Sequence, residues 1–209
     1  MKLTLIGMTT VGKSYWSQQF EAAGFERINL DGIINDNLIA HIGDSQVQTH
    51  EAISSWLGLP SEARYAENEK KLMQFETEAF KYALSILESK PKNARVILDT
   101  GGSLIYASPR YWHLLRQLTP IIYLKMDDTI HQKLVENYLR DTRWVLWNGC
   151  FDAKKGETMM ETYSRCYHNL IRTREKLYET YADYTIEYSV HRDKKMTVDA
   201  LLTRLSLSS

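Results

Sequence analysis

The chain has 209 residues, which is enough for one domain with a substantial hydrophobic core. Lysine and arginine together number 26, as do aspartate and glutamate, so the formal net charge is zero. This balance excludes a bulk attraction to nucleic acid or to an anionic membrane, but it leaves room for a local cationic pocket that binds phosphate. We therefore expect a small-molecule substrate, no nucleic-acid or membrane partner, and a monomer or weak homodimer.

The cellular compartment is indicated by the cysteines and by the first residues. Cys150 and Cys166 lack the spacing of a metal or redox site, which is typical of a reducing compartment. The N-terminal sequence MKLTLIGMTT has too short an apolar run for a signal peptide, and no stretch approaches the length of a membrane span. These features predict a cytoplasmic protein.

The predicted elements alternate between short apolar strands and longer helices. In order they are a strand at 3–6, a helix at 12–23, a strand at 25–30, helices at 31–42, 44–57 and 61–89, and a strand at 96–98. A helix at 109–118, a strand at 121–124, helices at 127–140 and 158–181, a strand at 184–188 and a helix at 198–205 follow. This alternation predicts an α/β protein with a five-stranded parallel sheet covered by helices on both faces. We expect one domain over 1–209, with an irregular, lid-like insertion at about 141–158.

Two of the helices carry further signals. Asp44 or Ser45 is the expected N-terminal cap of the helix at 44–57. The helix at 61–89 carries apolar side chains close to helical spacing on one face, which is typical of an amphipathic helix. These residues are Phe75, Ala79, Tyr82 and Ile86.

Residues 7–14, GMTTVGKS, match the phosphate-binding pattern G-x-x-x-x-G-K-S between a predicted buried strand and a predicted helix. Its glycines let the backbone turn tightly, so consecutive N–H groups can cradle phosphate oxygens at the positive end of the helix. Lys13 can reach the β- and γ-phosphates, and the Ser14 hydroxyl can bind Mg²⁺. A chance match is the alternative, and the strand–loop–helix context weighs against it. The residues expected to bind nucleotide are Gly7, Thr9, Thr10, Val11, Gly12, Lys13 and Ser14.

A phosphate loop alone does not distinguish GTPases, ATPases and small-molecule kinases. Residues 99–102, DTGG, match the D-x-x-G pattern of GTPases. No N-K-x-D segment that would read guanine follows in the sequence. This weighs against a GTPase.

Four later segments carry a further pattern. They are INLDGII at 28–34, ARYAE at 63–67, TGGS at 100–103, and REKLYE at 174–179 followed by Ala182-Asp183. Together with the phosphate loop they resemble the shikimate kinase family, over most of the chain. The resemblance implies the three-layer P-loop NTPase fold, with ATP and Mg²⁺ as cofactors. It also implies phosphoryl transfer to an alcohol group of shikimate or a similar acid.

The resemblance implies roles for residues at the acceptor. Asp31 matches the aspartate that binds the substrate hydroxyls, where it would orient the acceptor hydroxyl and take its proton. Arg64 and Arg174 match two arginines that bind the substrate carboxylate, for which a guanidinium fork is suited. Gly101 and Gly102 match glycines that approach the substrate.

The phosphate and metal side of the site is implied in the same way. Arg143 lies in the place of a lid arginine that reaches the transferred phosphate. Asn29 occupies the position of an aspartate that assists Mg²⁺. Because Asn29 supplies no charge, we expect Asp99 to serve with Ser14 on the metal side, although Asp99 could instead cap the turn that follows it. The expected catalytic residues are Lys13, Asp31 and Arg143.

Four positions depart from the family pattern, namely Asn29, Ser103, Trp144 and Lys176. All four are expected near the substrate or the lid, so they concern the acceptor rather than the fold. Trp144 and Trp147 in the insertion are typical packing residues, which in a mobile lid could also cover a nucleotide or acceptor.

Several of these roles have a purely structural alternative. Asp31 could cap a helix, and Arg64 could pair with Glu67 on a helix surface. Arg174 could lie on an ordinary helix surface, and Arg140 competes for the lid role. Two other functions also stay open. A gluconate-kinase-like or nucleotide-kinase-like enzyme would use the same loop and lid, and a nucleotide-binding pseudokinase would keep the loop without turnover.

Overall fold

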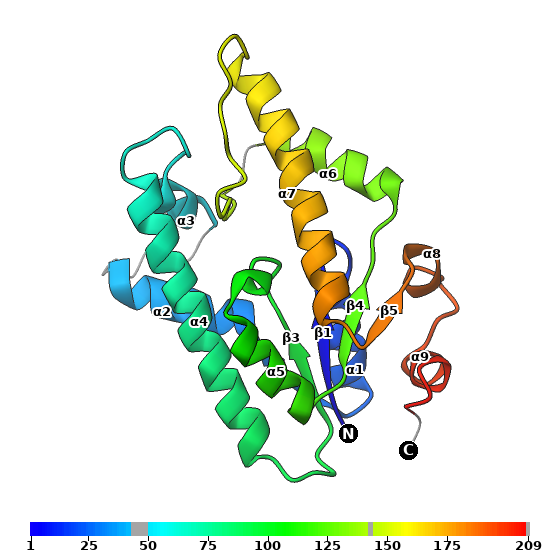
Figure 1. Ribbon diagram of the computed structural model, residues 1–209. Coiled ribbons are helices and arrows are strands. Elements are labelled where there is room, and N and C mark those ends of the chain that lie inside the picture. The colour runs from blue at the N-terminus through cyan, green and yellow to red at the C-terminus, as the bar shows by residue number, and fades with distance from the viewer. Residues whose placement is uncertain (43–49, 142–143, 208–209) are drawn as a thin grey trace.

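The computed structural model describes residues 1–42, 50–141 and 144–207 (Figure 1). Its five-stranded sheet is parallel throughout and has the strand order β2-β3-β1-β4-β5. The strands are β1 (Lys2–Ile6), β2 (Glu26–Asn29), β3 (Val96–Asp99), β4 (Ile121–Leu124) and β5 (Tyr184–Ile186). Every residue of β3 and β4 is buried, because helices flank the sheet and cover both faces of a central strand. The predicted α/β, three-layer, five-stranded parallel architecture is confirmed.

The helices follow the predicted order with small differences at their ends. They are α1 (Lys13–Ala22), α2 (Leu30–Ile42), α3 (His50–Leu57), α4 (Tyr65–Ser89), η1 (Leu104–Tyr106), α5 (Pro109–Leu118), α6 (Asp128–Arg140), α7 (Met159–Tyr181), α8 (Tyr188–His191) and α9 (Val198–Arg204). The short elements η1 and α8 were not predicted, since one turn of helix leaves no periodic pattern. Asp44 and Ser45, the predicted caps, lie outside the described residues.

Helix α4 buries a broader and different face from the one that apolar spacing suggested. Tyr82 is 57% exposed. Phe75 and Ile86 are only partly buried. The buried face is instead formed by Tyr65, Leu72, Glu76, Ala79, Phe80, Ala83, Leu84 and Leu87. The reason is that α4 packs against α2 and α3 as well as α5, and these neighbours, rather than the helix alone, decide which side chains lose solvent.

The segment at 144–158 joins α6 to α7 beyond the carboxyl ends of the strands (Figure 1). It has no regular secondary structure, as predicted. Trp147 of this segment is fully buried, and aromatic rings of α6 and α7 surround it. Its neighbours are Tyr138 in an edge-to-face contact, Tyr163 and Tyr167. Trp147 therefore packs this segment against the helical hairpin.

A carboxylate of α4 also holds this segment. Glu69 Oε1 accepts hydrogen bonds from the backbone N–H groups of Trp147 at 2.6 Å and Asn148 at 2.9 Å. The Tyr65 hydroxyl donates to the carbonyl oxygen of Val145 at 2.8 Å. The backbone of the first half of the insertion is thus hydrogen-bonded to side chains of α4.

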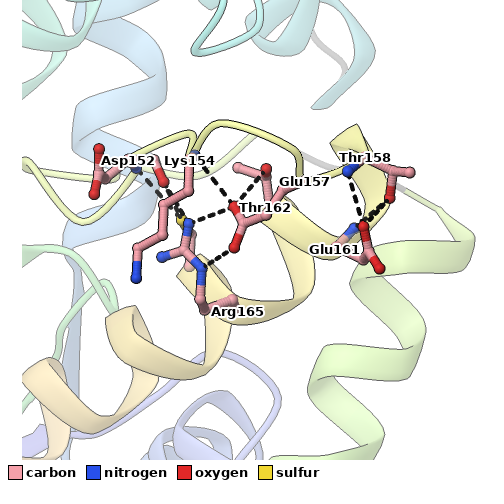
Figure 2. A network of polar contacts seen from close by, with 8 residues as sticks. Asp152, Lys154, Glu157, Thr158, Glu161, Thr162 and Arg165 are labelled. Atoms are coloured by element: carbon pink, nitrogen blue, oxygen red, sulfur yellow. Dashed lines mark hydrogen bonds and ion pairs between the residues drawn. The ribbon is translucent and has the colours of Figure 1, made fainter.

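The second half of the insertion is held to the beginning of α7 (Figure 2). Arg165 donates two hydrogen bonds to the carboxylate of Glu157, at 2.6 and 2.7 Å, and a third to the carbonyl oxygen of Asp152. This pairing holds the pKa of Glu157 down at about 2. Thr158 and Glu161 form a reciprocal capping box at the helix N-terminus.

In the part of the chain that the structure describes, no helix is both long enough and apolar enough to cross a membrane. Cys150 and Cys166 are free thiols.

Candidate active site

The phosphate loop joins the end of β1 to the start of α1. Gly7 has a φ of 145° and Gly12 a φ of 114°, which are conformations that side chains rarely adopt. A β-carbon on Gly7 would lie 2.7 Å from the carbonyl oxygen of Leu124, so β4 leaves no room for a side chain there. With glycine at its N-cap, α1 begins without a side-chain cap. Its first N–H groups and the positive end of its dipole are therefore suited to an anion.

The side chain of Lys13 folds back over the phosphate loop. Its Nζ donates to the carbonyl oxygens of Gly7 and Met8, at 2.9 Å each. Burial lowers the pKa of this ammonium group, while the carboxylates of Asp31 and Asp99 raise it. The two carboxylates are thus close enough to Lys13 to stabilise its charge. Asp31 follows the end of β2 and Asp99 is the last residue of β3, so the ends of both strands lie near the phosphate loop.

The glycine pair at 101–102 is where the predicted residues meet. A β-carbon on Gly101 would lie 2.5 Å from Oδ1 of Asp31. A β-carbon on Gly102 would lie 3.2 Å from Oγ1 of Thr9 and 3.6 Å from Nη1 of Arg174. An acid, a residue of the phosphate loop and a guanidinium therefore surround two residues that have no side chain of their own.

Arg174 is buried, which excludes the alternative of an ordinary surface arginine. Its Nε donates to the Tyr106 hydroxyl at 3.1 Å, and its Nη2 donates to the carbonyl oxygen of Leu146 at 2.8 Å. On the same helix, the Tyr178 hydroxyl donates to the carbonyl oxygen of Gly102 at 2.5 Å. Helix α7 thus connects the glycine pair to the insertion.

The structure does not bring Arg64 to this cluster. Its side chain is 56% exposed and pairs with Glu62 at 2.7 Å, just before α4 begins. Glu67, the partner that the sequence suggested, pairs with Lys71 instead. Arg143 lies outside the described residues. Arg140, its rival, is exposed and donates to Asn137 in the last turn of α6.

Asp99, the predicted metal-side carboxylate, lies at the end of β3. Oδ2 of Asp99 accepts hydrogen bonds from Arg27 at 2.6 Å and from the Ser17 hydroxyl at 2.7 Å. The Ser17 hydroxyl oxygen also lies 3.1 Å from the carbonyl oxygen of Ser14. Ser14 itself is exposed at the first turn of α1. Across residues 1–42, 50–141 and 144–207, no group of three or more His, Cys, Asp or Glu side chains is placed so that it could hold a metal ion.

Sequence reasoning missed two residues of the site. Glu76 of α4 is buried and accepts a hydrogen bond from the Ser103 hydroxyl, next to the glycine pair. Arg192 follows α8, and its Nη1 would be 3.2 Å from a β-carbon on Gly12. The departure at Ser103 was visible in the sequence, but its partner was not. Arg192 stands in a basic stretch, RDKK, that has no position relative to the loop until the chain folds.

Comparison with solved structures places this architecture among known folds. A shikimate kinase from Acinetobacter baumannii in complex with shikimate matches with 17% identity and a TM-score of 0.56, over 99% of this chain and 90% of that one. A shikimate kinase from Aquifex aeolicus matches with 14% identity and a TM-score of 0.57, over 99% and 96%. A dephospho-CoA kinase from Campylobacter jejuni matches with 14% identity and a TM-score of 0.51, over 99% and 96%.

The chain has the P-loop kinase fold. At these identities the likeness concerns the fold alone, because the same fold carries several acceptor specificities. No protein-family model matches the sequence, and no curated protein matches it. The P-loop kinase fold accounts for the position of the phosphate loop between β1 and α1, and the acceptor must be argued from the side chains at the glycine pair.

Proposed function

We propose that the protein transfers the γ-phosphoryl group of ATP to a hydroxyl group of a small hydroxylated metabolite. The observation that supports this most is the convergence of Asp31, Thr9 and Arg174 on the glycine pair. These residues come from α2, the phosphate loop and α7, so local structure does not explain why they meet. An acid, a phosphate loop and a guanidinium in one site are what phosphoryl transfer between small molecules requires.

The residues of the loop suit ATP and Mg²⁺. The conformations at Gly7 and Gly12 form a loop that a β-carbon would obstruct, and the Lys13 ammonium already bonds to loop oxygens. The exposed hydroxyl of Ser14 would hold the metal, with Asp99, whose Oδ2 shares the Ser17 hydroxyl with the backbone of Ser14, as the proposed carboxylate. When bound, Mg²⁺ would neutralise charge on the phosphates.

The proposed step balances as a simple displacement. The acceptor hydroxyl oxygen forms a bond to the γ-phosphorus, the bond from that phosphorus to the β–γ bridging oxygen breaks, and ADP leaves. Asp31 accepts the hydroxyl proton, and Lys13 stabilises the charge on the transferred group. Arg143 stays the proposed lid arginine for the same charge. Arg174 contributes from the acceptor side.

The resemblance of the sequence names shikimate or a similar acid as the acceptor, and this makes shikimate the first compound to test. The remaining features belong to the same proposal. We propose one kinase domain over 1–209, which works in the cytoplasm as a monomer or weak homodimer on a small-molecule substrate.

The test is ADP release from ATP and Mg²⁺, with and without shikimate and with a panel of other hydroxylated metabolites. Acceptor-dependent ADP release is expected in the wild type and should be lost in Lys13→Ala. Lys81→Ala, at an exposed lysine of α4 that pairs with Glu78, is the matched control and should keep full turnover. Unchanged turnover in Lys13→Ala would show that the phosphate site is assigned wrongly.

Two other results would redirect the proposal. Tight ATP binding without ADP release for any acceptor would support a nucleotide-binding pseudokinase. ADP release with nucleoside monophosphates alone would support a nucleotide kinase, and release with gluconate alone would support a gluconate kinase.

A further inference from the structure

A buried carboxyl group that the resemblance does not account for is hydrogen-bonded to the residue that follows the glycine pair. Glu76 lies in the middle of α4 and is 5% exposed. Its Oε1 accepts a hydrogen bond from the hydroxyl of Ser103, which is 8% exposed and directly follows Gly102. Ser103 is the residue that replaces a third glycine of the family pattern. Ser103, which replaces the glycine of the family pattern, and Glu76, which the sequence did not single out, are therefore hydrogen-bonded to each other.

Glu76 lies within the electrostatic reach of the other acceptor-side residues. The pKa of Glu76 is raised to about 7, chiefly by burial; the hydrogen bond from Ser103 and the charge of Arg174 lower it, and the charge of Asp31 raises it. The same two charged residues, Asp31 of α2 and Arg174 of α7, also act on Lys13. Two carboxyl groups and one guanidinium therefore influence one another around the glycine pair.

The site at the glycine pair differs from one in which two arginines bind a substrate carboxylate, because Arg64 lies elsewhere on the protein. Helix α4 is continuous from Tyr65 to Ser89, so Arg64 stands 12 positions before Glu76. At a rise of 1.5 Å per residue this separates them by about 18 Å along the helix axis. Arg174 already donates to Tyr106 and to the Leu146 carbonyl through two of its three nitrogens.

We propose that Glu76, positioned by Ser103, determines the specificity of the acceptor site and selects an uncharged polyhydroxylated acceptor over a carboxylic acid. This inference rests on the proposed kinase function. The ionised Glu76 carboxylate can only accept hydrogen bonds, and an acceptor hydroxyl group can donate one to it, whereas an acceptor carboxylate cannot. A buried site that must accept a hydrogen bond rejects ligands that leave it unpaired, and like charges in a poorly solvated site add to the rejection.

The experiment compares acceptors in which a carboxylate is present or is replaced by an uncharged group. Methyl shikimate is paired with shikimate, and glucitol with gluconate, and kcat/KM is measured from acceptor-dependent ADP release. The wild type should favour the uncharged member of the productive pair by about tenfold or more. Glu76→Gln keeps the size of the side chain and removes its charge, so it should lower this preference by about tenfold.

Two further variants separate specificity from folding. Glu78→Gln, on the exposed side of the same helix, should keep the wild-type preference. Ser103→Gly restores the glycine of the family pattern and releases Glu76, so the preference should fall while Glu76 itself is retained. A loss of turnover with both members of a pair, without a change in their ratio, would show that Glu76 and Ser103 are only structural and would overturn the inference.

The pH profile of the preference gives a readout that a purely structural role would not change. The charged groups known to act on Glu76 are Arg174 and Asp31, with Ser103 as its hydrogen-bond donor. As the pH rises from 6 to 8, Glu76 loses its proton, so the wild-type preference for the uncharged acceptor should increase. In Glu76→Gln the ratio should be flat over this range, and a slope equal to that of the wild type would overturn the inference.

The failure of this inference can be distinguished from the failure of the proposed function. No ADP release with either member of any pair overturns the kinase function and, with it, the inference. Turnover that favours shikimate over methyl shikimate, or gluconate over glucitol, overturns the inference and leaves the kinase function intact.

Discussion

Asp31 and Gly101 come from opposite ends of a long stretch of chain, yet a β-carbon on Gly101 would lie 2.5 Å from Oδ1 of Asp31. Such a contact is far shorter than two unbonded atoms tolerate, so the glycine is what allows the carboxylate to occupy its position. Strands β2 and β3 are parallel neighbours, and residue 29 pairs with residue 99, which brings the two loops to the same edge of the sheet.

The first prediction follows from this contact. Gly101→Ala should displace the Asp31 carboxylate and lower acceptor-dependent kcat/KM by about a hundredfold, with ATP binding little changed. Asp31→Asn should have an effect of similar size. The double variant should be hardly worse than either single one, since both remove the same positioned carboxylate. Steady-state kinetics of the three variants check this, and additive losses would mean that the two residues act separately.

A second prediction concerns the ion pair between Arg27 and Asp99 at the end of β3. The Asp99 side chain is 4% exposed and Arg27 is 17% exposed. Arg27→Met should reduce the free energy of unfolding by about 3 kcal/mol, because it leaves a buried carboxylate without its counter-charge. The exposed pair of Arg64 and Glu62 is the matched comparison, and Arg64→Met should change stability by less than about 1 kcal/mol. Urea denaturation of both variants decides, and equal effects would contradict the prediction.

A third prediction concerns pH and Glu76. Its folded-state pKa of about 7 lies above the ordinary value of 4.5. A carboxyl group whose pKa is raised by folding stabilises the folded state below its unfolded pKa, and this contribution is lost as the pH rises through 7. The wild type should therefore lose stability between pH 5 and pH 8, by up to about 3 kcal/mol from this group.

Glu76→Gln isolates that contribution from those of the other titrating groups. The difference in unfolding free energy between the variant and the wild type should move in favour of the variant as the pH rises from 5 to 8. Urea midpoints at several pH values give this difference. A difference that does not vary with pH would show that Glu76 has an ordinary pKa in the folded protein.

A fourth prediction concerns the insertion at 144–158. Glu69→Ala removes the acceptor of the Trp147 and Asn148 backbone N–H groups, so this segment should detach from α4 at a cost of about 2 kcal/mol. Tryptophan fluorescence should shift to longer wavelength and proteolysis of the segment should become faster. Glu69→Gln keeps a carbonyl oxygen as acceptor and should lie closer to the wild type in both measurements. Identical behaviour of the alanine variant and the wild type would mean that Trp147 packing and the Tyr65–Val145 hydrogen bond hold the segment without Glu69.

Several features could be predicted from the sequence because they depend on residues close together in the chain. The order of strands and helices follows from apolar periodicity and from the length of each run. The phosphate loop follows from two glycines, Lys13 and Ser14 at fixed spacing, since the conformations they require are local. Asp31 and the pair Gly101–Gly102 each follow a strand of the expected parallel sheet, so their common edge of the sheet was within reach of sequence reasoning, whereas the structure shows that the two strands are neighbours.

Other features were decided only by the tertiary structure. Arg64 looked equivalent to a carboxylate-binding arginine, but the length and direction of α4 place it on the surface and place Glu76 at the glycine pair instead. The hydrogen-bond partners of Asp99 and of Arg174 could not be predicted from the sequence either, because each partner is tens of residues away along the chain. Spacing determines which side chains share a face of one helix, whereas the packing of several helices around one sheet determines which of those side chains meet and lose solvent.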